Sequence, residues 1–132
     1  MDVATASRVR SLIGIAPQFL VDDLERSIEY YRRCLGFEPD FVYEGFYASV
    51  SRDGCSIHLK CAPKTEADRT HRRQHEHLDA HIEVTNATAL HDELTTRGAT
   101  ITTPLEDRPW SCRDFSVEDP DGYILCFSER LA

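Results

Sequence analysis

The sequence lacks three features that would assign it to large functional classes. It contains no run of about 18 uncharged apolar residues, so we expect no membrane-spanning helix and no membrane partner. It lacks a basic excess, because 23 Asp and Glu outnumber 15 Lys and Arg and the net charge is −8. Nucleic-acid-binding proteins carry basic stripes, so we expect no nucleic-acid partner. Residues 1–12 lack the apolar core of a signal peptide, which predicts a cytoplasmic protein with a flexible N-terminus.

Cysteine is present in an odd number, which does not favour a disulfide framework. Most of the five cysteines fall within expected strands or helices, which is typical of reduced thiols. They are Cys34, Cys55, Cys61, Cys112 and Cys126. With 41% hydrophobic and 29% charged residues, the composition is that of a soluble domain with a substantial core.

The most informative stretch is 109–127, in which a tight turn separates two alternating runs. Asp119-Pro120-Asp121-Gly122 combines a fixed φ at proline with a glycine that tolerates positive φ. Apolar residues occur at every second position before the turn and after it, as two half-buried strands require. Ile124, Cys126 and Ser128 form the other face of the second strand, and we expect that face to line the working surface.

The first half of the chain has the pattern of a strand, a helix and further strands. An apolar run from Leu12 to Val21 predicts a strand, with Pro17 placing it at an edge or bulge. Asp22 is predicted to begin a helix, in which apolar residues recur at helical spacing up to Leu35, and Gly36 is predicted to end it. Strands are expected over 41–50 and 55–61, with a turn at Asp53-Gly54 before the latter.

The second half follows the same order. Residues 77–84 alternate apolar with polar side chains and predict a strand. Thr85 or Asn86 is expected to cap the next helix, which Gly98 ends. Residues 62–76 are almost free of apolar side chains and predict a loop between the halves.

The repeated order predicts an internally duplicated α+β fold. We expect one structural domain with a flexible segment 1–12, a first βαβββ module 13–62, a linker 63–76 and a second βαβββ module 77–132. Their two curved mixed sheets would surround a cavity, with the helices outside. Offsets from the shared landmarks make His58 equivalent to Cys126 and Ala16 equivalent to Asp79, so these four positions should face the cavity.

Two motifs resemble the vicinal oxygen chelate superfamily, the fold of glyoxalase I, bleomycin-resistance proteins and extradiol dioxygenases. They are VDDLERSIEYYRRCLGF at 21–37 and PWSCRDFSVEDPDGY at 109–123. The resemblance covers about 13–129 and implies the duplicated fold. Because this fold hosts several chemistries and plain binding proteins, it does not imply one function.

The resemblance also implies where a metal would be held. Family enzymes use His and Glu at positions that correspond here to Ala16, His58, Asp79 and Cys126, with Gln18 and His81 as neighbouring substitutes. Alanine cannot ligate and none of these four positions is a Glu, so we expect no metal cofactor. The alternative is a divalent ion held by His58, Asp79 and Cys126 in a lyase, isomerase or dioxygenase.

The chain resembles the bleomycin-resistance branch of the superfamily more than the enzymes. This resemblance implies a homodimer that binds a small molecule, such as an antibiotic, in a groove between the subunits and does not catalyse a reaction. The acidic charge and aromatic rings favour a cationic, planar ligand. The residues expected to bind it are Gln18, Tyr47, His58, Asp79, His81, Trp110, Asp114 and Cys126.

Other interpretations of three of these side chains remain open. His58 could instead be a neutral imidazole hydrogen-bonded to Asp79, and Cys126 a small buried apolar side chain rather than a nucleophile. Trp110 could anchor the core or a dimer interface. The polar face of 77–83 could be solvated instead of lining a cavity.

Overall fold

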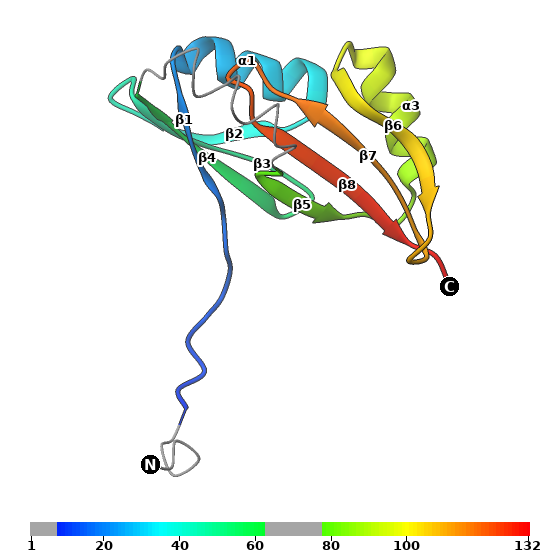
Figure 1. The fold of residues 1–132 in the computed structure, drawn as a ribbon. Helices are drawn as coiled ribbons and strands as arrows, with labels where there is room; N and C mark the ends of the chain where they lie inside the picture. Colours follow the sequence, from blue (N-terminus) through cyan, green and yellow to red (C-terminus); the bar gives the residue numbers. More distant parts are fainter. Residues whose placement is uncertain (1–7, 63–77) are drawn as a thin grey trace.

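The computed structural model describes residues 8–62 and 78–132, which form two βαβββ modules in succession (Figure 1). The first contains β1 (Gln18–Val21), α1 (Leu24–Leu35), β2 (Glu38–Tyr43), β3 (Tyr47–Arg52) and β4 (Cys55–Cys61). The second contains β5 (Ala80–Glu83), α3 (Ala87–Arg97), β6 (Thr100–Arg108), β7 (Cys112–Glu118) and β8 (Ile124–Arg130). The predicted linker 63–76 lies outside the described residues.

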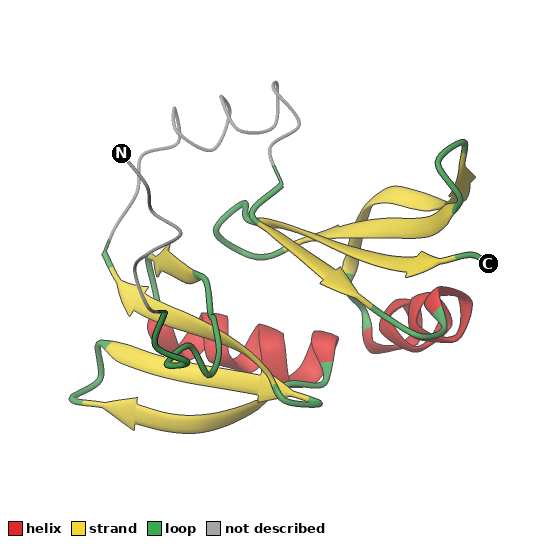
Figure 2. Cartoon of the chain, turned by 90° about the horizontal axis from the view of Figure 1, so that it is seen from below, coloured by secondary structure: helices red, strands yellow, loops and turns green. Residues whose placement is uncertain are grey.

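Each module forms a mixed four-stranded sheet. The strand orders are β1-β4-β3-β2 and β5-β8-β7-β6, with the first pair of each sheet parallel and the others antiparallel. Figure 2 shows the two sheets as neighbouring units, each with one helix beside it. The predicted α+β fold with tandem βαβββ modules is therefore confirmed.

Side chains at the helix ends explain where both helices begin and end. Asn86, one of the two predicted caps, begins α3 and accepts a hydrogen bond from the backbone N–H of Ala89 at 3.0 Å. The cap of α1 is Asp23, not Asp22: its carboxylate accepts from the N–H of Arg26 at 3.0 Å. Gly36 and Gly98 end the two helices in the left-handed conformation, as predicted.

Two predicted strands have different bounds in the structure. The strand expected over 12–21 is only β1, because residues 12–17 form no ladder and Ile15 is 96% exposed. The strand expected over 41–50 is split by a turn into β2 and β3, with Glu44 and Gly45 at positive φ. The strand expected over 77–84 is the shorter β5, whereas β4 has the predicted bounds.

The hydrophobic core lies between each sheet and its helix. The inward-facing residues alternate along the strands and meet the buried residues of the helices. They include Phe19, Val21, Tyr31, Leu35, Val50, Leu59, Leu94, Phe115, Val117, Leu125 and Phe127, all less than 5% exposed. The sheet faces that point away from the helices are therefore available to form a binding site.

The β7–β8 turn of the second module is hydrogen-bonded to α1 of the first. The hydroxyl of Tyr31 donates to Asp119 at 2.8 Å, and the hydroxyl of Ser27 donates to Asp121 at 3.0 Å. Nearby, the rings of Phe19 and Tyr123 stack with centroids 4.3 Å apart. The predicted turn thus joins the two modules as well as two strands.

A second connection joins the modules at the other end of α1. The guanidinium of Arg52 on β3 donates to both carboxylate oxygens of Glu93 on α3, at 3.0 and 2.8 Å, and to the carbonyl of Leu35 at 2.9 Å. Bidentate geometry fixes the relative position of the groups it joins. Within the described ranges, no helix is long and apolar enough to cross a membrane.

Candidate functional site

The face of the first sheet that points away from α1 carries a group of polar and aromatic side chains. Because side chains alternate along strands, the register of β1, β3 and β4 places Gln18, Tyr47 and His58 on this face. Gln18 lies opposite His58 across the parallel pair, and Ser49 lies opposite His58 on the other side. We call this surface the open face of the first sheet.

Tyr47 connects the polar groups of the open face. The amide of Gln18 donates to the hydroxyl oxygen of Tyr47 at 2.9 Å, and that hydroxyl lies 2.8 Å from Nδ1 of His58. The hydroxyl of Tyr47 can donate its own proton to Nδ1 while it accepts from the amide, and the tautomer of His58 sets the direction of that bond. In the tautomer that accepts this bond at Nδ1, His58 carries its proton on Nε2, where it is available to an acceptor group of a ligand.

Aromatic rings surround this hydrogen-bonded group. Phe41 lies nearly parallel to Tyr47, with centroids 6.3 Å apart and planes 5° apart, and it meets the edge of His58 at the same centroid separation. Phe46 contacts Tyr47 and Tyr43 edge to face. Phe41, Tyr43 and Phe46 are 42–58% exposed, although large apolar groups are usually buried. We call Phe41, Tyr43, Phe46, Tyr47 and His58 the aromatic cluster.

The open face of the second sheet is polar and contains Asp114 and Cys126. Asp114 accepts a hydrogen bond from Arg108 at 2.8 Å, so its charge is compensated. Cys126 is 6% exposed, and burial raises the pKa of its thiol. A thiol in this setting is mostly protonated at neutral pH and is a poor nucleophile, in agreement with the interpretation as a small buried side chain.

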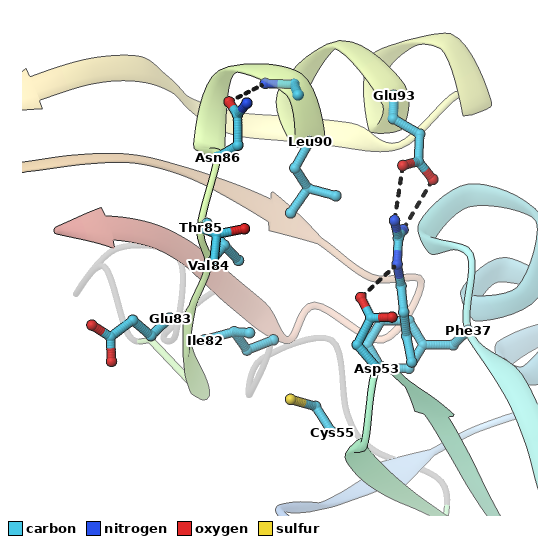
Figure 3. A pocket seen from close by; sticks show the side chains of 12 residues that line it. Phe37, Asp53, Cys55, Ile82, Glu83, Val84, Thr85, Asn86, Leu90 and Glu93 are labelled. Atoms are coloured by element: carbon cyan, nitrogen blue, oxygen red, sulfur yellow. Dashed lines mark hydrogen bonds and ion pairs between the residues drawn. The ribbon is translucent and has the colours of Figure 1, made fainter. Parts of the chain in front are cut away.

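A cleft of about 400 Å³ lies at the junction of the two modules (Figure 3). Phe37, Cys55, Ile82 and Leu90 contribute to its lining. Arg52 and Glu93, which are hydrogen-bonded to each other, also line it. A neighbouring cleft of about 660 Å³ is lined by the segment before β1, the β3–β4 turn region and β5. The junction therefore offers space, with mainly apolar walls.

The predicted site residues do not all come together. Ala16, Asp79 and His81 line the larger junction cleft, and His81 lies opposite Cys126 in the β5–β8 register. Trp110 is 68% exposed in the turn between β6 and β7, so it is not a core residue. The structure thus divides the predicted set among the first open face, the second open face, the junction and one turn.

The alternative in which His58 is hydrogen-bonded to Asp79 is not what the structure shows. His58 bonds Tyr47, whereas the carboxylate of Asp79 accepts from the N–H of Ile124 at 2.8 Å. Ala16 and Asp79 both precede their strands, so the residues that lie opposite His58 and Cys126 are Gln18 and His81. Gln18 and His81, which the sequence analysis named as substitutes for Ala16 and Asp79, are thus the residues on the open faces.

Among the residues that the structure describes, the donor side chains do not fit a metal site. Across residues 8–62 and 78–132, no three or more His, Cys, Asp or Glu side chains are grouped so that they could hold an ion. Zinc and related metals take three or four such protein ligands. No step of a reaction is therefore assigned to a metal here.

The structure adds residues that the sequence interpretation did not select. Phe41 and Tyr43 could have been found from their spacing of two, which places them on one strand face next to Tyr47. Asp40 gave no such signal, because it lies at an irregularity between Pro39 and Phe41 that shifts the register of β2 on β3.

Two consecutive βαβββ modules, each with a helix on one sheet face and an open face on the other, define a duplicated α+β scaffold. A family model described as the Glyoxalase/Bleomycin resistance protein/Dioxygenase superfamily matches residues 15–127. The chain belongs to this superfamily. A search of curated proteins finds no match.

Solved structures with the same fold include a glyoxalase-related enzyme from Clostridium phytofermentans, with a TM-score of 0.75, 19% identity, and coverage of 95% of this chain and 100% of that one. A bleomycin-binding protein from bleomycin-producing Streptomyces verticillus, complexed with copper(II)-bleomycin, has a TM-score of 0.67, 26% identity, and coverage of 94% and 99%. A bleomycin resistance determinant encoded on the transposon Tn5 has a TM-score of 0.73, 15% identity, and coverage of 90% and 98%.

Proposed function

We propose that this chain is a metal-free protein that binds a small aromatic molecule on the open face of the first sheet. The observation that carries the proposal is the aromatic cluster around the Gln18–Tyr47–His58 hydrogen bonds. Stacking on exposed rings favours a flat ligand, and Nε2 of His58 supplies a directed donor. No bond of the ligand is broken, so the role is capture.

The proposed groove is completed by a second copy of the chain. Leu12, Ile13 and Ile15 are 96–101% exposed, and the aromatic cluster is partly exposed as well. Apolar surface of this extent commonly marks an interaction site. In the dimer we propose, residues of the second module, including Trp110, Asp114 and Cys126, would reach the ligand from the other side of the groove.

The relatives favour an antibiotic as one candidate ligand. The Streptomyces verticillus protein, at 26% identity, is a bleomycin-binding protein. The five cysteines are all free thiols, which is consistent with the cytoplasmic location that we propose for a sequestering protein.

Calorimetric titration tests this function. We expect saturable heat with bleomycin or with another compound from a panel of planar aromatic molecules. Tyr47→Ala should weaken binding by about tenfold or more, because it removes a stacking ring. Tyr47→Phe, which keeps the ring and loses the hydroxyl, should weaken it less. Trp110→Ala should also weaken it, because the proposed dimer brings Trp110 to the ligand. Absence of heat across the panel would contradict the proposal.

Elemental analysis tests whether the function needs a metal. Protein purified without added metal should contain no stoichiometric Zn, Ni, Mn or Fe, because the polar groups of the open face are hydrogen-bonded to one another. A stoichiometric ion that disappears in His58→Ala would support the alternative, a metal-dependent lyase, isomerase or dioxygenase.

A further inference from the structure

Lys60 places a positive charge on the open face of the first sheet. It lies two residues after His58 on β4, so both side chains point to the same side of the sheet, about 7 Å apart along the strand. In the register, Lys60 lies between Leu20 of β1 and Tyr47 of β3. Lys60 is exposed, and among the described residues none forms an ion pair with it. Its ammonium group is therefore available to a ligand on this face.

The hydrogen-bonded group of Gln18, Tyr47 and His58 has a donor left over. Gln18 donates to the hydroxyl oxygen of Tyr47, so this oxygen already accepts one bond. The neutral pair of Tyr47 and His58 carries one hydroxyl proton and one ring proton, and the 2.8 Å bond between the hydroxyl and Nδ1 uses one of them. If Tyr47 donates, the N–H at Nε2 of His58 is left; if His58 donates, the hydroxyl proton of Tyr47 is left. In either tautomer, one proton remains for an acceptor of the ligand.

Three rings of the aromatic cluster lie at the same end of the open face as Lys60. Tyr43 lies opposite Tyr47 across β2 and β3, and Tyr47 lies opposite Lys60 across β3 and β4. Phe46 meets the rings of Tyr43 and Tyr47 edge to face, with centroids 5.8 and 6.5 Å away. A ligand that lies flat on these rings has its edge within reach of the ammonium group. Charge-assisted hydrogen bonds from an ammonium group favour a carboxylate over a neutral acceptor.

The carboxylate of Asp40 is held at the opposite end of this face. One of its oxygens accepts from the hydroxyl of Ser49 at 2.8 Å, and the other accepts from the hydroxyl of Ser51 at 2.7 Å. These serines lie two and four residues after Tyr47 on β3, away from the Tyr47–Lys60 pair. The open face is therefore polarised along β3, and its positive end is the end beside the three rings.

We propose that Lys60 and the donor left over from Tyr47 and His58 form an anion-selective subsite, which binds a planar aromatic ligand carrying a carboxylate or a similar anionic oxygen group. This inference rests on the proposed function, which it narrows from aromatic small molecules to aromatic acids. It also reverses the ligand charge that the net charge of −8 favoured, because that charge is spread over the whole surface and the ligand meets one face. The left-over donor bonds an oxygen of the ligand, and Lys60 selects for negative charge.

Calorimetry with three probes of nearly equal shape tests the subsite. The probes are 2-naphthoate, which is anionic near neutral pH, 2-naphthamide, which is neutral, and 2-naphthamidine, which is cationic. The wild-type protein should bind naphthoate about fivefold more tightly than naphthamide, and naphthamidine should bind most weakly. Lys60→Met should abolish the preference for naphthoate and leave naphthamide binding within about twofold of wild type, because the side chain keeps its length and loses only its charge. Rising salt concentration should weaken the binding of naphthoate but not that of naphthamide.

Two further variants control for charge and position. Lys60→Arg keeps a positive charge at the same place, so the preference for naphthoate should remain. Arg33→Gln removes one positive charge from α1, on the other side of the sheet, where the Arg33 side chain is 71% exposed, and the preference should again remain. A loss of naphthoate binding in Arg33→Gln equal to that in Lys60→Met would overturn the subsite, because the effect would then come from net charge alone.

The outcomes separate the two proposals. Equal affinity of the wild-type protein for the three probes, tightest binding of naphthamidine, or a preference for naphthoate that survives in Lys60→Met overturns the anion-selective subsite and leaves the aromatic binding function intact. Binding of none of the probes, together with no heat from the aromatic panel, overturns both. Thermal denaturation of Lys60→Met should match wild type, because Lys60 is exposed and forms no ion pair with a described residue.

Discussion

At the residue scale, folding strongly alters the ionisation of Asp119. Its side chain is 3% exposed at the junction of α1 and the β7–β8 turn. Burial raises its pKa to about 6, although Tyr31 and the backbone N–H groups of Tyr123 and Asp121 oppose this by hydrogen-bonding to it. A folded-state pKa above the unfolded value means that the folded protein holds this proton more tightly.

This shift predicts how stability depends on pH. The contribution of Asp119 is complete below its unfolded pKa of about 4 and is lost as pH rises through about 6, so it falls by on the order of 3 kcal/mol across that window. In Asp119→Asn the decrease should vanish, because the amide is neutral at every pH. Urea unfolding of both proteins between pH 4 and pH 8 measures the difference, and parallel stability profiles would contradict it.

At the scale of elements, both helices end at a left-handed glycine, but the two glycines differ in surroundings. Gly36 has φ of +74°, and a Cβ there would lie 2.8 Å from Nη1 of Arg52. Gly98 has φ of +92°, and a Cβ there would meet no atom within 4 Å. Replacing Gly98 therefore tests backbone strain alone, whereas replacing Gly36 also displaces the guanidinium that joins β3 to α3.

The two alanine variants should consequently differ in stability. Gly98→Ala should destabilise by about 1 kcal/mol, the cost of left-handed backbone for a residue with a Cβ. Gly36→Ala should cost about 1 kcal/mol more, because Arg52 must move away from Leu35 and Glu93. Chemical denaturation measures both values. An equal loss in the two variants would mean that Arg52 adjusts without losing its bonds.

At the scale of the whole molecule, the two modules are firmly joined to each other. Some apolar side chains, by contrast, contact little of the rest of the chain. Tyr31 and Ser27 of α1 bond the second module's turn, and Arg52 bonds Glu93. The segment before β1, however, keeps Leu12 and Ile13 97–101% exposed. A second copy of the chain would remove such side chains from water, which is the main driving force of association.

We therefore expect a dimer with twice the 15.1 kDa mass of the chain in sedimentation equilibrium. Ile13→Asp should shift the equilibrium toward monomer, because a charge in an apolar interface is costly, without lowering the stability of the fold. Thr88→Asp, at an exposed position in the first turn of α3, is the matched control and should leave the dimer unchanged. A monomeric wild-type protein would contradict the expectation.

Local signals in the sequence determined most of the fold. The alternation in 115–127, the Asp-Gly turns and the glycines at 36 and 98 act over a few residues, so they could be recognised without the rest of the chain. Their repetition predicted the duplicated architecture. Element ends were less certain: Asp23 replaced the adjacent Asp22 as the cap of α1, because two neighbouring carboxylates carry the same local signal.

The tertiary structure alone decided which side chains meet. Strand register brought Gln18, Tyr47 and His58 together, directed Asp79 to the backbone of Ile124, and neutralised Asp114 with Arg108. The irregularity at Asp40 placed a carboxylate beside the aromatic rings. These pairings join residues on different strands, and a shift of one position would exchange the two faces of a strand. Sequence spacing therefore fixes the elements of this protein, and the pairing of the strands fixes its site.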